Sequence, residues 1–205
     1  MNLKLTKKIV GYMIVALLLF FIGYTIPNYF SNKGTIKKEA FNHDLEGYEG
    51  GVYLRFVYIG SESCLWCGEE TNSMVKKLKD YYKELADKSN LKFISTGIAN
   101  DYSSIKGINF LSKSGVYDEI ISGGNYYNIG SQRYIWNDFP SNASTPQILI
   151  TLSEFMVESA GTGEIFNIQL NEKLLVRIEG YYEIIEHFDL VDSSSHDKMS
   201  TVLGL

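Results

Sequence analysis

The most informative run in the sequence is Val52-Tyr-Leu-Arg-Phe-Val-Tyr-Ile-Gly-Ser-Glu-Ser-Cys-Leu-Trp-Cys67. Residues 52–59 are rich in β-branched and aromatic side chains, which is typical of a buried strand. Gly60 and the polar residues after it interrupt this strand. Apolar residues then recur at three- and four-residue spacing, which predicts a helix over residues 66–88. The sequence therefore places a C-x-x-C pair where a strand ends and a helix begins.

Cys64 and Cys67 are the only cysteines in the 205-residue chain. At the start of a helix, unpaired backbone N–H groups and the helix dipole favour a thiolate over a thiol. A thiolate is the species that attacks disulfides. A disulfide across so short a loop adds little stability through chain entropy, because that effect grows with loop length. Redox chemistry is therefore a better explanation of the pair than structural stabilisation by a disulfide.

Two other interpretations of the cysteine pair stay open. The pair is either half of a zinc site or an inert structural feature. A structural zinc ion needs four ligands, commonly Cys and His, and the three histidines, His43, His187 and His196, stand at scattered positions. No metal and no other cofactor is expected.

The N-terminal region determines the expected compartment. Residues 9–26 carry no charge, and as a helix they span roughly 27 Å, close to the thickness of a bilayer core. Lysines precede this run, so residues 1–8 are expected in the cytoplasm and the rest of the chain outside the cell membrane. The main rival is a cleaved signal peptide, but no A-x-A-like site follows the run. We expect a retained single-pass signal anchor.

The rest of the chain has the length of one domain. Residues 27–48 are rich in polar, charged and turn-forming residues and are expected to be a linker. We expect the domain over residues 49–191 and a flexible, Ser-rich tail over residues 192–205. The net charge of −5 gives no basic face for nucleic acid.

Further elements follow the predicted helix. A strand over residues 91–96 would complete a βαβ unit. The pattern weakens from residue 99 to residue 144, where a helical turn is assigned to residues 116–122. Beyond it we expect a strand at 147–152, weak alternation at 155–159 and 164–169, a turn at Asn171-Glu172, a strand at 173–178 and a helix at 181–188.

In this order of elements the chain resembles thioredoxin-fold thiol–disulfide oxidoreductases over roughly residues 50–190. The first landmark is the strand, C-x-x-C pair and helix. The second is Thr145-Pro146 opening a strand, like the cis-proline that faces the cysteine pair in that fold. The third is the last strand, Gly180 and the final helix. The resemblance implies an α/β fold with a mixed sheet flanked by helices. The membrane-anchored layout is most similar to the bacteriocin-transport-accessory type from Gram-positive bacteria.

The departures from the thioredoxin pattern are also informative. Thioredoxins carry a tryptophan before the first cysteine and Gly-Pro between the pair, whereas Leu65 and Trp66 lie between the cysteines here. They also place a buried acid in the preceding strand, where this chain has Tyr58, and Glu62 is expected to be exposed. The segment before Pro146 is longer than the fold needs, which predicts an insertion near residues 100–140.

The resemblance implies a role for each residue of the site. Cys64 would be the attacking, more exposed thiolate, and Cys67, one turn on and more buried, would resolve the mixed disulfide. Trp66 would be a substrate-facing lip or a packed aromatic side chain. Thr145 would offer its backbone N–H and C=O to an extended peptide. Pro146 would be the substrate-groove proline or an ordinary strand-opening proline.

The expected function is that of a membrane-tethered, extracytoplasmic thiol–disulfide oxidoreductase. Its partners would be cysteine-containing exported proteins or peptides and, because the chain has only two cysteines, a separate redox protein that recycles the pair. The alternative is an accessory or peptide-docking module with little redox activity, for example in bacteriocin export. Oxidation, reduction and isomerisation are all compatible with these residues.

Overall fold

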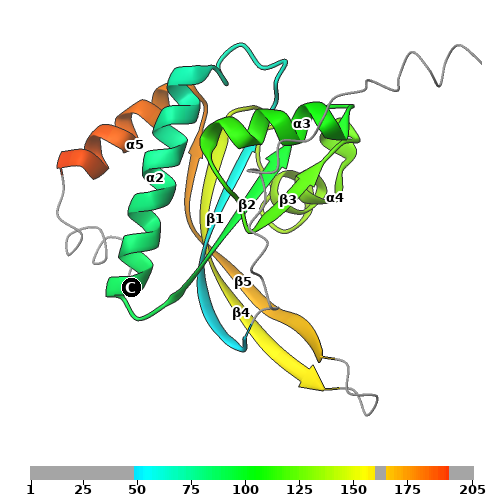
Figure 1. The fold of residues 1–205 in the computed structure, drawn as a ribbon, viewed down its shortest axis with the longest axis vertical. Helices are drawn as coiled ribbons and strands as arrows, with labels where there is room; N and C mark the ends of the chain where they lie inside the picture. Colours follow the sequence, from blue (N-terminus) through cyan, green and yellow to red (C-terminus); the bar gives the residue numbers. More distant parts are fainter. Residues whose placement is uncertain (1–48, 160–164, 194–205) are drawn as a thin grey trace, which may run out of the picture. The chain divides into compact units, whose positions relative to one another are not determined.

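The structure is a computed structural model that describes residues 49–159 and 165–193. These residues form a five-stranded mixed sheet covered by helices (Figure 1), with the strand order β3-β2-β1-β4-β5. The parallel strands are β1 (Gly51–Gly60), β2 (Lys92–Ala99) and β3 (Glu119–Ser122), and the antiparallel strands are β4 (Gln147–Ser159) and β5 (Ile165–Glu179). The mixed α/β class predicted from the sequence is confirmed.

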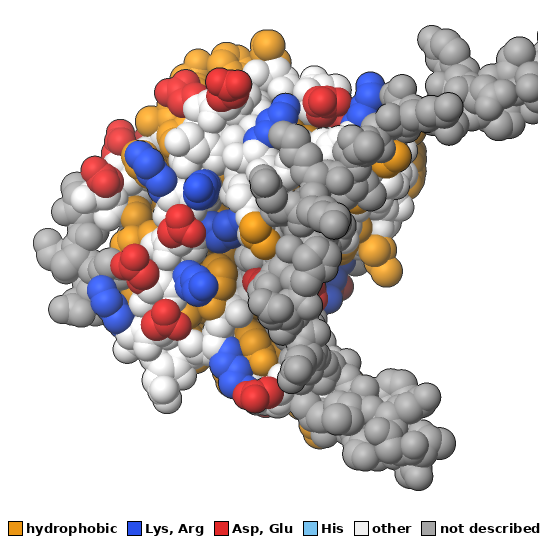
Figure 2. All heavy atoms as spheres, viewed as in Figure 1, with side chains coloured by type: hydrophobic (Ala, Val, Ile, Leu, Met, Phe, Trp, Pro, Cys, Tyr) orange, Lys and Arg blue, Asp and Glu red, His pale blue; other side chains and the backbone are white. Residues whose placement is uncertain are grey.

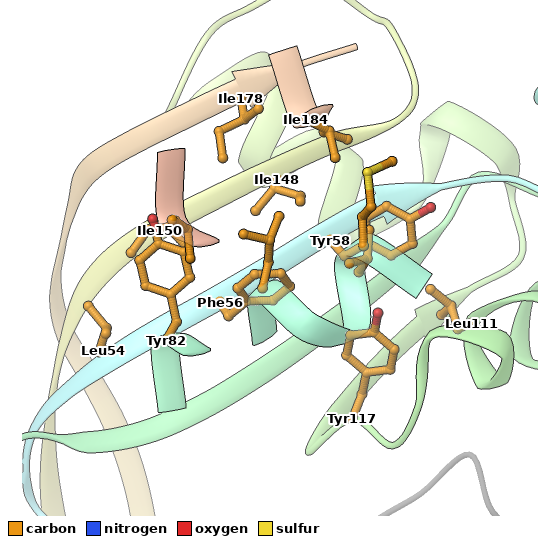
Figure 3. Packing of buried hydrophobic residues seen from close by; sticks show 14 of the residues in the cluster. Leu54, Phe56, Tyr58, Tyr82, Leu111, Tyr117, Ile148, Ile150, Ile178 and Ile184 are labelled. Atoms are coloured by element: carbon orange, nitrogen blue, oxygen red, sulfur yellow. The ribbon is translucent and has the colours of Figure 1, made fainter. Parts of the chain in front are cut away.

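Strand β1 lies at the centre of the sheet and is buried from Tyr53 to its end. Because side chains alternate along a strand, Leu54, Phe56 and Tyr58 point into one apolar cluster, and Val57 and Ile59 point into another. Figure 3 shows the first cluster, in which the β1 side chains meet those of β4 and the helices. The buried strand predicted from the sequence is therefore present, and it presents its C-terminal end to the cysteine pair.

Helix α2 (Glu69–Lys88) crosses the face of the sheet on which Phe56 lies. It begins three residues later than the sequence predicts, because Gly68 adopts an extended conformation at the N-cap. Helix α5 (Tyr181–Ser193) follows Gly180 and packs beside α2 (Figure 1), and it ends five residues beyond the predicted end at 188. Both helices close over one face of the sheet and bring their first turns to the same end of the domain.

The segment between β2 and β4 contains elements that the sequence pattern does not reveal. The helical turn predicted for residues 116–122 is wrong, because Glu119–Ser122 pairs in parallel with the end of β2 as strand β3. Helix α3 (Ser104–Leu111) precedes it. Gly107 within α3 lies so close to Ala99 and Ser122 that a side chain would collide with them. The expected insertion near 100–140 thus includes one strand of the sheet itself.

Strands β4 and β5 form a long hairpin that extends beyond the other strands as an arm (Figure 1). The turn predicted at Asn171-Glu172 is wrong, because these residues continue β5 and pair with Glu154 and Ser153. Local turn preference is overridden here by tertiary contacts, since the Glu172 carboxylate accepts hydrogen bonds from buried partners. The surplus residues between Leu152 and Lys173 build this arm, whose connection at 160–164 lies outside the described residues.

A polar network lies on the second face of the sheet. The Glu172 side chain is 3% exposed and accepts from Thr151 Oγ1 at 2.5 Å, Arg133 Nη2 at 2.5 Å and Tyr134 Oη at 3.2 Å. Arg55 on β1 is buried 3.7 Å from the same carboxylate and also pairs with Glu119 of β3. Ion pairs therefore connect β1 with β3 and β5, and Arg133 with β5.

His187 on α5 provides a pH-dependent contact with α2. Its Nε2 lies 2.7 Å from Tyr82 Oη, and the two rings stack. Burial lowers the pKa of His187 below its usual value of 6.5. The unfolded chain therefore takes up this proton at a higher pH than the folded chain does.

We predict that this histidine makes the domain less stable as the pH falls below about 6.5. His187→Gln should keep a hydrogen bond to Tyr82 but lose this part of the pH dependence. Urea unfolding of both proteins between pH 7.5 and 5 measures the difference. Burial raises the pKa of Asp101, which has the opposite effect on pH dependence, but Asp101 is present in both proteins. Parallel stability curves for the two proteins would contradict the prediction.

Several sequence-based expectations lie outside the described residues. They concern residues 1–8, the anchor at 9–26, the linker at 27–48 and the tail after residue 193. Within residues 49–159 and 165–193, none of the helices combines the length and apolar character needed to cross a bilayer.

Candidate functional site

The cysteine pair occupies the loop that joins β1 to α2. Two backbone hydrogen bonds shape this loop, from Cys64 N to Ser61 O and from Cys67 N to Cys64 O, each 3.2 Å long. Cys64 and Cys67 are joined by a disulfide, with their Cα atoms 5.3 Å apart. The C-x-x-C pair thus stands at the junction of strand and helix, as the sequence predicts, at a distance suited to redox chemistry.

The two cysteines differ in their access to solvent. Cys64 is partly exposed, whereas Cys67 is 5% exposed and belongs to the main apolar cluster. Leu65 between them is 85% exposed, so the outer side of the loop is open. An incoming thiol or disulfide therefore reaches Cys64 rather than Cys67.

The first turn of α2 follows Cys67 directly. Gly68 occupies the N-cap, and no described side chain caps the first N–H groups of the helix. Thr71 Oγ1 donates to Trp66 O at 2.7 Å, and Asn72 Nδ2 donates to Cys67 O at 3.1 Å, so the cysteine loop is held onto the helix. Glu69 and Glu70 lie in the first turn, where acidic side chains complement the helix dipole. The uncapped N–H groups favour negative charge on a nearby sulfur.

Thr145 and Pro146 lie beside the cysteines, although they are about 80 positions away in sequence. The Thr145–Pro146 peptide bond is cis, and the Thr145 carbonyl oxygen lies 3.4 Å from Cys64 Sγ. The antiparallel register, in which Ile59 pairs with Gln147, brings the start of β4 to the end of β1. The sequence-based prediction of a cis peptide next to Cys64 is confirmed. In the reduced form, the Cys64 thiol can donate to this carbonyl.

Trp66 is both packed and accessible. Its ring stacks on Tyr181 of α5 with centroids 5.3 Å apart and contacts Tyr182 at 5.9 Å, yet it remains 48% exposed. Tyr181 Oη donates to Glu70 at 2.8 Å. We call Trp66, Tyr181 and Tyr182 the aromatic ledge. Figure 2 shows apolar and acidic side chains next to one another at the upper end of the molecule, where α2 begins.

Asp101 is a residue of the site that the sequence analysis missed. It follows β2 and is 8% exposed, and its carboxylate accepts from Ser61 Oγ at 3.1 Å and from Glu62 N at 3.2 Å. Burial raises the pKa of Asp101 above its ordinary value. The signal that would have found it is its place directly after a strand parallel to β1, because the carboxyl ends of parallel strands meet at one edge.

Tyr58 occupies the level of β1 where thioredoxins place a buried acid. Its side chain is fully buried, and its hydroxyl has no hydrogen-bond partner among the described residues. Burial raises the pKa of Tyr58 well above its usual value. Within the described ranges, no three His, Cys, Asp or Glu side chains are placed to hold a metal ion.

Comparison with known proteins gives no relative. No family model matches the chain, and neither do any curated protein or any solved structure. The fold and the site nevertheless define a class. The chain contains a mixed α/β domain with a disulfide-forming C-x-x-C pair between its central strand and the following helix, an arrangement compatible with the thioredoxin-like fold.

Proposed function

We propose that this chain is a thioredoxin-like thiol–disulfide oxidoreductase that exchanges the Cys64–Cys67 disulfide with cysteines of other polypeptides. One observation carries the proposal. The accessible sulfur of the pair lies in the loop that leads into α2, and it is 3.4 Å from the carbonyl oxygen of Thr145, just before β4. A purely structural disulfide would need neither the exposure of Cys64 nor a backbone carbonyl beside it.

The exchange proceeds in two balanced steps. The Cys64 thiolate attacks one sulfur of a substrate disulfide, forms a mixed disulfide and releases the other substrate sulfur as a thiolate. The Cys67 thiolate then attacks Cys64 Sγ, forms the internal disulfide and releases the second substrate thiolate. The two protons of the dithiol pass through solvent to the released thiolates, and two electrons pass to the substrate. The reverse sequence oxidises a substrate dithiol.

The neighbouring groups suit an extended polypeptide substrate. The backbone of Thr145 would hydrogen-bond a chain whose cysteine meets Cys64, and Pro146 has no N–H of its own to offer. Because Cys67 is buried, it is shielded from thiols in solution. It would therefore react with the mixed disulfide next to it. Trp66, which packs on the first residues of α5, would contact the substrate on that side of the cysteine pair. These roles support exchange with proteins rather than with small thiols alone.

The setting of the reaction is part of the proposal and rests on the sequence. The uncharged run at 9–26 with lysines before it supports a single-pass anchor that holds the domain outside the cell membrane. A cysteine-containing exported protein or peptide would be the substrate, and a separate redox protein would recycle the pair. The bacteriocin-transport-accessory type of thioredoxin-like protein is the narrower assignment that this layout favours.

A docking function is the second candidate, and the aromatic ledge supports it. Two side chains of the ledge, Trp66 and Tyr182, are exposed beside the site, and so is the neighbouring Leu65. A peptide would bind to these apolar side chains without any redox step. Replacing both cysteines by serine separates the two functions. The oxidoreductase loses all exchange activity, whereas the docking module keeps its affinity for the same peptide.

We predict that Cys64 is the reactive cysteine of the reduced chain, with a pKa below the ordinary value of about 8.5. The reasons are its exposure and the uncapped N-terminus of α2. Alkylation of the reduced chain between pH 5 and 9, followed by peptide mass spectrometry, should label Cys64 before Cys67. Equal labelling of both cysteines, or reaction only at alkaline pH, would contradict the proposed redox role.

A further inference from the structure

An open pocket of about 590 Å³ lies in the segment between β2 and β4. Its lining includes four aromatic side chains and two amides, from Tyr102, Tyr126, Tyr127, Trp136, Asn125 and Gln132. Tyr102 and Tyr127 are each 84% exposed and Trp136 is 44% exposed, so their rings are available to a ligand. The volume is within the range of small-ligand pockets.

The chemistry of the lining selects the kind of group that fits. Every described residue that lines the pocket is uncharged. An ionic group entering it would lose water without gaining a charged partner. Aromatic faces favour flat or aliphatic groups, and the amides of Asn125 and Gln132 can serve a backbone peptide group. The pocket therefore suits an uncharged apolar or aromatic side chain.

The walls of the pocket are held by buried polar contacts. Asn100 is 4% exposed, and its Oδ1 accepts from Asn128 Nδ2 at 3.1 Å and from Ser131 Oγ at 2.5 Å. Asn128 Oδ1 in turn accepts from Ser131 N at 2.8 Å. Trp136 lies in the π-helical turn Gln132–Asn137 that follows. These contacts hold the backbone next to the lining residues, which lowers the entropy that the backbone loses when a ligand binds.

Two short stretches of chain connect the pocket to the surroundings of the cysteine pair. The Asp101 carboxylate holds the loop before Cys64, while the carbonyl of the same residue accepts from Asn125 N at 3.2 Å, and the next residue, Tyr102, lines the pocket. On the other side, Ala143 lines the pocket two residues before Thr145. From Cys64 Sγ to Ala143 Cα the separation is at most roughly 13 Å, which about four extended residues span.

We propose that this pocket binds an apolar or aromatic side chain of the substrate polypeptide, two to four residues from the cysteine that meets Cys64. The inference rests on the proposed oxidoreductase function and adds a substrate class to it. The backbone of the substrate passes Thr145, and its apolar side chain enters between Tyr127 and Trp136. The residues that build this subsite come from the same segment that supplies strand β3.

Matched peptides test the proposal with the reduced full-length chain. Each peptide carries one cysteine as a mixed disulfide with glutathione, and either Phe or Ser stands two, three or four residues from that cysteine on either side. In a single turnover of the reduced chain, we expect the second-order rate constant for glutathione release from at least one Phe placement to exceed that for the matching Ser peptide about tenfold, as one apolar pocket contact typically gives. Asp at the same position should give no gain.

Two sets of substitutions identify the pocket as the source of the preference. The double variant Tyr127→Ser/Trp136→Ser should bring the Phe-to-Ser ratio close to one, whereas Ile129→Ser, at a 77% exposed neighbour outside the lining, should keep it. A cysteine-free Phe peptide should bind the wild type more tightly than the double variant in calorimetry. Equal rates for all peptides, or a preference that survives the double variant, would overturn the subsite. Failure of every peptide to exchange would instead overturn the oxidoreductase function.

Discussion

Replacing Cys67 by serine is expected to trap substrate polypeptides on Cys64 as stable mixed disulfides. Cys67 is the only other cysteine in the sequence and is buried beside Cys64, with 5.3 Å between their Cα atoms, and in the proposed exchange it displaces the bound substrate. Without its thiolate, the second step stops, and release depends on an external thiol. The trapped species should be visible on non-reducing gels, and peptide mass spectrometry should locate the bond at Cys64.

The reverse substitution is the matched control. Cys64→Ser removes the accessible sulfur and leaves a cysteine that is 5% exposed, so it should trap no substrate and show no exchange. Trapping by both variants to the same extent would contradict the assignment of the two roles. Trapping at Cys67 in the Cys64→Ser variant would reverse the assignment.

Glu172→Ala is expected to lower the free energy of unfolding by about 3–5 kcal/mol, because it leaves one buried cation, Arg55, and two buried hydroxyls without their common acceptor. Arg55 lies 3.7 Å from this carboxylate, and Arg133 and Thr151 both donate to it. The side chain of Glu172 is 3% exposed, so water does not readily replace it. Urea unfolding at neutral pH measures the loss.

Lys173→Ala provides the control on the same strand. Lys173 is the next residue of β5 and is exposed, and a surface substitution there should change stability by no more than about 0.5 kcal/mol. A loss of less than about 1 kcal/mol in Glu172→Ala would show that the network contributes little to stability. Glu172→Gln keeps the shape of the side chain and separates loss of charge from loss of packing.

The elements around the cysteine pair could be predicted because each has a strong local signal. The apolar run before Gly60 and the helical spacing after Cys67 are each long enough to specify their structure. The position of Thr145-Pro146 followed from topology, since the next strand had to begin beside the end of β1. The exposure of Cys64 and burial of Cys67 followed from their places in the turn. These local signals were enough to locate the cysteine pair and the Thr145-Pro146 peptide beside it.

The residues that could not be predicted depend on contacts between distant parts of the chain. Strand β3 has only four residues and forms because the edge of β2 accepts it. Asn171 and Glu172 have the local character of a turn but continue a strand, since Glu172 finds buried donors across the sheet. The sequence does not distinguish Asp101 from the other acidic residues, 24 in all. Its role becomes visible only in the fold, where β2 brings it next to Ser61. The pocket likewise assembles from short helical turns and loops with no periodic pattern.

The central claim is that the Cys64–Cys67 pair cycles between dithiol and disulfide. Equilibration of the full-length chain with glutathione buffers, followed by acid quenching and thiol alkylation, tests this most directly. We expect a two-electron transition with a midpoint above about −300 mV, as is usual for accessible, exchanging pairs. A pair that stays fully oxidised in every glutathione buffer would behave as a structural disulfide and would contradict the claim.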